Sequence, residues 1–449
     1  MKRLQIPTRY ASRVLVPDFT AGLDAATDEA SASFRSAVEL FNFDVSSGAL
    51  TDGYAPAGDM GTENATGVWI YRRNDGAVTD TFMYSDTAGK VYYRENNTFK
   101  ELAGVQFTSP VKAINYRLNG EDVIIMCSAS DDMAVWNRVD PPYTVAGSPR
   151  VTSMTLHYER LFVTTEGERN TVYFSDDLDP TNWSLDLSGG GFIELSDELG
   201  RLNKVVSYLN YVYIFRDYGI SRLTAYADQT EFSVSNLFVG SGRIYPETVT
   251  LCGDRILFLA SDGLYAFDGL SATRILKKLS ACITGGQPVA AYYDGKYYLA
   301  AKIRAAGDPI GCESGTYVNN GFIVYDLQTG SACVSRGYDV RGFARLTPYL
   351  VADGRIYGIG KTCPLKKRWR MPQTDLGRPD AVKEVTAAVI ETAGAVTVTV
   401  TTERGEKTLP LTAGLHRVKV GLAGRRVGLV IEAEGAGAHI SRPQLLLRL

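Results

Sequence analysis

The stretch Asp254-Arg-Ile-Leu-Phe-Leu-Ala-Ser-Asp-Gly-Leu-Tyr-Ala-Phe-Asp-Gly269 decides the fold class. Two apolar or alternating runs flank a Ser-Asp-Gly turn, which is typical of a β-hairpin because Gly and Asp tolerate the backbone conformations of tight turns. Similar hairpins occupy residues 82–93 and 122–136, and others begin near residues 160, 211, 294 and 353. A repeat of about 40–50 residues is typical of one four-stranded β-propeller blade.

The repeat predicts an all-β architecture with two domains. We expect a six- or seven-bladed β-propeller with an N-terminal entry segment over residues 1–365, and a small antiparallel β-sandwich over residues 380–449. Residues 366–379 are basic and contain Pro and Gly, which predicts a linker. A Gly-rich insertion around residues 305–320 lengthens the last repeat. Residues 28–41 have apolar side chains at helical spacing, which predicts a helix.

Charge is unevenly distributed along the chain. The formal net charge is −3, with 33 Lys and Arg against 42 Asp and Glu in residues 1–365, and 14 against 8 from Lys366 onward. This balance predicts no bulk electrostatic attraction to nucleic acid or to an anionic membrane. The longest apolar runs are far shorter than the roughly 20 residues of a membrane span, so no membrane anchor is expected.

Residue types that catalyse reactions or bind metals do not form a known motif in this sequence. The six Cys contain no C-x-x-C pair, and only three His are available to join them, so zinc-ligand spacing is absent. Phosphate-loop, zincin and nucleophile-elbow motifs are absent as well. We therefore expect buried packing thiols, packing or surface histidines, and no catalytic residue, cofactor or metal ion.

An acidic turn in mid-chain, Ser175-Asp-Asp-Leu-Asp-Pro-Thr-Asn-Trp183, loosely resembles the Asp-box turn of sialidase-like propellers. In that family Ser, Asp, Thr and Trp side chains lock a hairpin away from the catalytic centre. The resemblance implies a structural turn that uses Ser175, Asp177, Asp179, Thr181 and Trp183, although one residue is inserted here and Asp179 replaces the usual Gly. A Ca²⁺ loop on Asp177 and Asp179, or a glycan site, is the alternative.

Two other motifs have a structural and a functional interpretation. Tyr325-Asp-Leu-Gln-Thr-Gly330 resembles the Asp-x-x-Thr-Gly turn of quinoprotein-type propellers, but it occurs once, which favours an ordinary polar hairpin turn.

A basic segment combines four cations with an aromatic ring. It could contact phosphate or an acidic partner surface, or be a solvated part of the linker. The segment consists of Lys366, Lys367, Arg368, Trp369 and Arg370.

Several further segments occur in a characteristic order along the chain. They are Ala37-Val-Glu-Leu-Phe-Asn-Phe-Asp-Val45, Gly48-Ala-Leu-Thr-Asp-Gly-Tyr-Ala-Pro56, Glu159-Arg-Leu-Phe-Val163, Asn170-Thr-Val-Tyr-Phe-Ser-Asp176, Asp179-Pro-Thr-Asn-Trp183, Tyr213-Ile-Phe-Arg-Asp-Tyr-Gly-Ile-Ser-Arg-Leu223 and Ile256-Leu-Phe-Leu-Ala-Ser-Asp-Gly-Leu-Tyr265. Together they resemble the β-propeller tail proteins of tailed bacteriophages, of the packaged-DNA stabilisation, nozzle or muzzle type. The likeness covers most of the chain.

This resemblance implies a non-enzymatic virion protein, made in the cytoplasm of the bacterial host and assembled as a homo-oligomeric ring, most simply a hexamer, around the DNA exit channel. The implied partners are further copies of the chain, neighbouring portal, adaptor or other tail proteins, and genomic DNA that passes without specific binding. An acidic wall suits such a conduit, because dense Lys and Arg would retain duplex DNA through counterion release.

Two other functions stay open from the sequence. A propeller that binds a host-surface carbohydrate would use exposed Tyr and Trp side chains at the blade loops as stacking platforms. A glycoside hydrolase would need two carboxylates that face each other across a pocket, and the sequence does not locate such a pair among 50 Asp and Glu.

Overall fold

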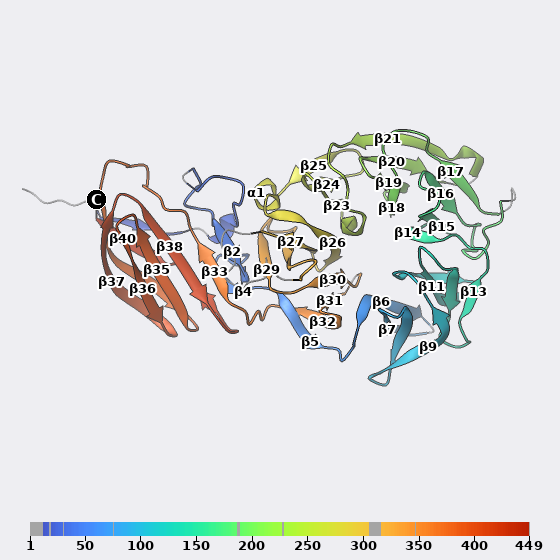
Figure 1. Ribbon diagram of the computed structural model, residues 1–449, viewed down its shortest axis with the longest axis horizontal. Coiled ribbons are helices and arrows are strands. Elements are labelled where there is room, and N and C mark those ends of the chain that lie inside the picture. Colours follow the sequence, from blue (N-terminus) through green and yellow to red (C-terminus); the bar gives the residue numbers. More distant parts are fainter. Residues whose placement is uncertain are drawn as a thin grey trace, which may run out of the picture.

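The computed structural model describes residues 12–17, 19–29, 31–74, 76–185, 189–226, 229–304, 316–345 and 347–448. These residues form two units, which Figure 1 shows side by side: a ring of small sheets and a sandwich of two sheets. The helical elements of the described chain are single turns. They are η1 (Phe19–Ala21), η2 (Gln229–Glu231), η3 (Pro246–Thr248) and α1 (Lys277–Ser280).

The ring is a β-propeller, and the described residues form seven four-stranded antiparallel blades. Blades 1 to 3 are β6 (Ala65–Asn74), β7 (Val78–Asp86), β8 (Lys90–Glu95) and β9 (Thr98–Gln106); β10 (Lys112–Leu118), β11 (Glu121–Cys127), β12 (Met133–Trp136) and β13 (Tyr143–Val145); β14 (Val151–His157), β15 (Arg160–Thr165), β16 (Thr171–Phe174) and β17 (Gly191–Glu194). Blades 4 to 6 are β18 (Leu202–Tyr208), β19 (Tyr211–Arg216), β20 (Gly219–Thr224) and β21 (Ser233–Val239); β22 (Thr250–Cys252), β23 (Arg255–Ala260), β24 (Gly263–Phe267) and β25 (Ala272–Ile275); β26 (Ile283–Tyr293), β27 (Lys296–Ile303), β28 (Gly321–Asp326) and β29 (Ala332–Arg336). The predicted propeller is confirmed.

Blade 7 closes the ring with a strand from the opposite end of the propeller sequence. Its first three strands are β30 (Val340–Phe343), β31 (Tyr349–Ala352) and β32 (Arg355–Gly360), and its fourth is β5 (Ala55–Asp59). β5 pairs antiparallel with β32 over Ala55↔Gly360 to Asp59↔Tyr357. Backbone hydrogen bonds between the first and last propeller strands therefore hold the ring shut and cover the free edge of β32.

The hairpins seen in the sequence are confirmed. β23 and β24 pair with Leu259 opposite Leu264, around a turn at Ser261 and Asp262. The expected starts near residues 82, 122, 160, 211, 254 and 294 mark the second strands of blades 1 to 6. Asp326 Oδ1 accepts hydrogen bonds from the backbone of Gln328 and Thr329, which makes the predicted polar turn between β28 and β29. Residues 305–315 of the expected insertion lie outside the described chain.

A hydrophobic cluster lies between each pair of neighbouring blades, and burial of these apolar surfaces stabilises the ring. The cluster between blades 5 and 6 is the largest. It contains Leu257 and Tyr297 of these blades, continues through Val334 on β29, and includes Trp369 of the sandwich. The propeller and the sandwich thus share one continuous core.

The sandwich is built from both ends of the described chain. One sheet has the order β1-β40-β34-β39-β4-β3, with β37 paired to β34, and the other has the order β2-β33-β38-β35-β36. The strands are β1 (Ser12–Leu15), β2 (Glu39–Phe41), β3 (Phe43–Asp44), β4 (Leu50–Asp52), β33 (Lys367–Arg370), β34 (Lys383–Thr392), β35 (Val396–Thr402), β36 (Gly405–Leu411), β37 (Gly414–Gly424), β38 (Val427–Ala433), β39 (His439–Ile440) and β40 (Gln444–Arg448). The predicted antiparallel sandwich is present and larger than expected.

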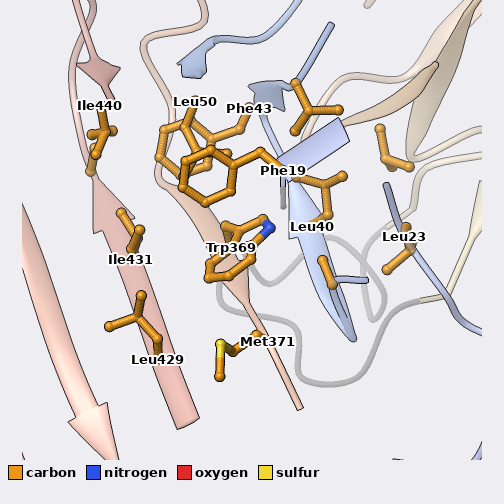
Figure 2. Packing of buried hydrophobic residues seen from close by; sticks show 14 of the residues in the cluster. Phe19, Leu23, Leu40, Phe43, Leu50, Trp369, Met371, Leu429, Ile431 and Ile440 are labelled. Carbon is orange, nitrogen blue, oxygen red and sulfur yellow. The ribbon is translucent and has the colours of Figure 1, made fainter. Parts of the chain in front are cut away.

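Two of the predicted domain boundaries are wrong. Residues 12–52 do not belong to a propeller unit spanning 1–365, because β1 to β4 pair with sandwich strands. Residues 366–379 are not a free linker, since β33 is the second strand of the five-stranded sheet and pairs with both β2 and β38. Figure 2 shows Trp369 of β33 among apolar side chains of both sandwich sheets and of the N-terminal segment.

The helix expected at residues 28–41 is also wrong. Residues 31–38 form turns, in which Ser33 and Ser36 hydrogen-bond within the local backbone. Ser side chains compete in this way with helical hydrogen bonds. Val38 instead donates to the carbonyl of Arg370, and β2 then continues the pairing with β33. Strand pairing with a segment more than 300 residues away overrides the helical spacing of the apolar residues.

Candidate functional site

Charged side chains from different blades meet on the axis of the propeller. The first strands of the blades, together with η3, surround this axis and contact their neighbours. Lys112 begins β10 of blade 2, Lys204 lies on β18 of blade 4, and Glu247 lies in η3, which leads into β22 of blade 5. Arg345 follows β30 of blade 7. We call these four residues the axial cluster.

One carboxylate in the axial cluster is shared by two lysines. Lys112 Nζ lies 2.5 Å from Glu247 Oε1, and Lys204 Nζ lies 3.5 Å from Glu247 Oε2. Blades 2 and 5 are not neighbours in the ring, so the Lys112–Glu247 pair crosses the channel. The Arg345 side chain is exposed and makes no ion pair within the described residues. Its positive charge nevertheless acts on both Lys204 and Glu247, so three cations and one anion interact in this region.

The protonation of the axial cluster reflects its confinement. Burial lowers the pKa of Lys204 to about 8, although the negative charge of Glu247 opposes this shift. Only 5% of the Lys204 side chain is exposed, so its ammonium group has lost most of its hydration. Burial alone would raise the pKa of Glu247, but the charges of Lys204, Lys112 and Arg345 hold it below its usual range. The site is thus cationic at neutral pH, and its carboxylate is ionised.

No motif in the sequence indicates the axial cluster directly. Its members lie in four separate repeats, and Lys112 is 135 residues from Glu247. The available signal was Lys204 within the run Leu202-Asn-Lys-Val-Val-Ser-Tyr208, where a cation interrupts a strand whose first part is buried. A buried lysine needs a partner, but only ring closure determines that the partner comes from blade 5.

The acidic turn of blade 3 has a structural role, but one of its residues differs from the expected set. Ser175 is buried, and its Oγ accepts a hydrogen bond from Leu161 N and donates to the Asp176 carbonyl, both at 3.0 Å. Asp179 Oδ1 accepts from the backbone N–H and the hydroxyl of Thr181, at 2.9 and 2.6 Å. Trp183 is half-buried against the cluster between blades 2 and 3. Asp177 was expected in this turn but is exposed. The neighbouring Asp176 takes its role and accepts a hydrogen bond from the Asn182 side chain.

The basic segment on β33 is neutralised internally. Arg368 pairs with Glu39 at 2.5 Å and Glu432 at 2.7 Å, and Arg370 pairs with Glu29 at 2.5 Å and Glu39 at 2.7 Å. Lys367, with no exposed side-chain surface, lies 3.2 Å from Asp52. Trp369 is 1% exposed, and Lys366 lies 3.2 Å from Glu432. Acidic residues of the same unit thus match the charges of this segment, which leaves less unpaired charge for the possible contact with an outside phosphate or acidic partner.

The excess of Lys and Arg from Lys366 onward does not make the sandwich basic, because the N-terminal segment adds acidic residues to the same unit. The described sandwich, residues 12–52 and 367–448, contains 15 Lys and Arg and 15 Asp and Glu. The propeller, residues 55–360, contains 27 against 35. The acidic excess therefore lies in the propeller, while the sandwich is formally neutral.

His157 is the one buried histidine among the three in the chain. Its Nδ1 lies 2.8 Å from Ser207 Oγ on the neighbouring blade, and its ring packs edge-on against Tyr158 at 4.4 Å between centroids. Burial lowers the pKa of His157 to about 4, so the ring is neutral in the folded protein at pH 7. On the sandwich, His416 is partly exposed and His439 is exposed.

Five of the six cysteines lie in the part of the chain that the structure describes. Cys127, Cys252, Cys282, Cys333 and Cys363 are buried free thiols, whereas Cys312 lies outside the described chain. No group of three or more His, Cys, Asp or Glu in the described residues is placed to hold a metal ion. None of the helices in this part of the chain has the length and apolar character needed to cross a membrane.

Comparison with known proteins identifies similarities of fold. Virginiamycin B lyase from Staphylococcus aureus aligns with a TM-score of 0.45 and 9% identity, covering 68% of this chain and 98% of the lyase. The Cps50 (Swd1) β-propeller domain of Myceliophteria thermophila aligns with a TM-score of 0.46 and 12% identity, covering 68% and 99%. PorZ of Porphyromonas gingivalis aligns with a TM-score of 0.42 and 9% identity, covering 80% of this chain and 46% of PorZ.

No protein-family model matches the sequence, and no curated protein matches it. At such low identity, the structural similarities concern the β-propeller fold alone.

Proposed function

We propose that this chain is a structural subunit of a bacteriophage tail, of the nozzle or muzzle type, which assembles with copies of itself into a ring around the DNA exit channel. The proposal starts from the resemblance of the ordered sequence segments to that family. Its partners would be neighbouring subunits, portal or adaptor proteins above it, and DNA in transit. Its location would be the virion, after synthesis in the host cytoplasm.

The observation that supports a structural role best is the single core shared by propeller and sandwich. The cluster that contains Leu257 and Tyr297 of blades 5 and 6 continues to Trp369 and Ile431 of the sandwich. Asn42 N also donates to the Val334 carbonyl at 2.7 Å, which ties the sandwich to the outer strand of blade 6. A subunit built this way presents two different surfaces in a fixed relation, as heterologous ring contacts require.

The axial cluster indicates where a DNA passage would have to lie. The Lys112–Glu247 ion pair crosses the propeller's own channel, so that channel does not offer an open path for a duplex. A conduit would therefore lie between subunits, bordered by outer surfaces. The acidic excess of the propeller suits this arrangement, because a wall with few unpaired cations would not retain DNA by counterion release.

Electron cryomicroscopy of the assembled particle tests this proposal. Antibody labelling of the chain on purified particles would identify its density. We expect several copies around the tail axis, next to the portal complex, with the sandwich in contact with a neighbouring protein. Density for this chain in a peripheral fibre, a single axial copy, or absence of the chain from purified particles would overturn the proposal.

A second candidate, binding of a host-surface carbohydrate, is favoured by one exposed aromatic pair. Tyr158 and Tyr226 are 48% and 65% exposed, with ring centroids 5.4 Å apart, at loops of blades 3 and 4. Aromatic faces of this kind can stack on sugar rings. A glycan array probed with the native chain and with Tyr226→Ala tests it. Saturable binding that Tyr226→Ala abolishes would favour adsorption, whereas the tail-ring proposal expects no glycan binding.

A further inference from the structure

The axial cluster has more positive charge than its own residues neutralise. Glu247 supplies one negative charge, which Lys112 at 2.5 Å and Lys204 at 3.5 Å must share, and Arg345 adds a third cation. The formal charge of the cluster is therefore +2. Cations held in a confined protein environment need partners, and bulk water screens them less than it screens surface charges.

The cluster is also open to water, as a ligand site must be. The Glu247 side chain is 43% exposed and that of Lys112 is 27% exposed, while the Arg345 side chain is exposed as well. Lys204, with 5% exposed, lies deeper. The exposed parts of Lys112 and Glu247 give a small ion from solvent access to this cluster, and the positive charge of Arg345 acts on it as well.

The chemistry of the cations points to an oxyanion with two charges. Guanidinium groups donate two parallel hydrogen bonds to phosphate oxygens, and ammonium groups add compact point charges. We propose that the axial cluster binds a small phosphate-type dianion, with Arg345, Lys112 and Lys204 as its contacts and Glu247 as the internal counter-ion with which it competes. This proposal does not depend on the tail-ring function.

Calorimetric titration of the full chain with inorganic phosphate in a low-chloride buffer tests the site. We expect saturable binding, weakened about tenfold or more in Arg345→Gln, since losing a hydrogen bond to a charged group changes affinity on the order of tenfold. Glu247→Gln should instead tighten binding, because it removes the competing carboxylate. Arg117→Gln, which removes an exposed arginine on the same strand as Lys112, serves as the matched control and should leave binding unchanged.

Two further ligands separate the possible sources of the phosphate chemistry. Glycerol 3-phosphate that binds as tightly as inorganic phosphate would indicate recognition of a phosphoryl group on a larger molecule, whereas binding of phosphate and sulfate only would indicate the free ion. Acetate should bind at least about tenfold more weakly than either dianion. Absence of saturable phosphate binding, or equal affinity in the native chain, Arg345→Gln and Glu247→Gln, would overturn the proposal. Arg345 is exposed and unpaired within the described residues, so its variant is expected to fold.

Discussion

At the scale of single residues, Trp369 and Trp183 lie in similar polar sequence surroundings but in different environments. Trp369 is 1% exposed, packs edge-on against Phe19 at 4.9 Å between ring centroids, and lies among Leu40, Leu429 and Ile431 (Figure 2). Trp183 is half-buried at the margin of a cluster between two blades. The two rings should therefore contribute unequally to stability.

We expect Trp369→Ala to lower the free energy of unfolding by about 3–5 kcal/mol, the range for truncation of a fully buried aromatic side chain. Trp183→Ala serves as the comparison and should cost clearly less. Urea denaturation followed by circular dichroism gives both values. Equal losses for the two variants would contradict the difference in burial described above.

His157 should make stability depend on pH in the acidic range. Its pKa is about 4 in the fold and about 6.5 when unfolded, so between these values the unfolded chain binds a proton that the folded chain does not. The free energy of unfolding should fall by roughly 3 kcal/mol as pH drops from about 7 to about 4. His157→Phe should remove this part of the slope. An unchanged slope in urea titrations of the variant would show that the ring is protonated in the folded protein.

At the scale of elements, the burial pattern along each strand explains why the blade repeats are clear in the sequence and why β33 resembles a linker there. The second strands of blades 2 to 5 are buried on both faces after their first one or two residues, so their sequences are continuous apolar runs that are easy to recognise. β33 alternates instead: Lys367 and Trp369 are buried, while Arg368 and Arg370 are partly exposed. With cations at three of four positions, its sequence is more typical of a solvated segment than of a strand.

The position of β33 within its sheet predicts resistance to trypsin. Lys367, Arg368 and Arg370 should not be early cleavage sites in the native chain. All three pair with β38, and Arg368 and Arg370 pair with β2 as well. Limited digestion followed by mass spectrometry checks this, and digestion in urea confirms that the same bonds are cleavable once unfolded. A native fragment that ends at Lys367 or Arg368 among the first products would restore the linker interpretation.

At the scale of the whole molecule, the propeller and the sandwich are interdependent. The chain enters through the sandwich, passes around the propeller from β5 to β32, and returns to the sandwich at β33. Both ends of the propeller are thereby anchored in one unit, and the shared cluster joins that unit to blades 5 and 6. Separate folding of residues 380–449, as the sequence suggested, would leave out five strands of the sandwich.

We expect one cooperative thermal transition for the full chain in scanning calorimetry, because the shared core couples the two units. Deletion of residues 1–52 should abolish or strongly lower that transition, since it removes β1 to β4 together with Phe19 and Leu40. Deletion of residues 1–11, which leaves every described strand in place, is the control. Two well-separated transitions in the full chain would show that the units unfold independently.

The sequence by itself determined the repeating part of the fold. Hairpins such as that of β23 and β24 form between segments a few residues apart, so apolar runs and turn residues specify them locally. The polar turn at Asp326 and the structural role of Ser175, Asp179, Thr181 and Trp183 follow from similarly local hydrogen bonds and packing. The propeller class was predictable for this reason.

The tertiary structure alone decided the domain boundaries and the axial cluster. β2 lies opposite β33 across more than 300 residues, and Lys112 meets Glu247 only because seven blades close into a ring. Nothing in the composition of either segment specifies its distant partner, since a strand edge accepts any compatible backbone and an ammonium any carboxylate. Burial of Trp369 in the shared core and closure of β5 onto β32 select these pairings, and both depend on the whole chain.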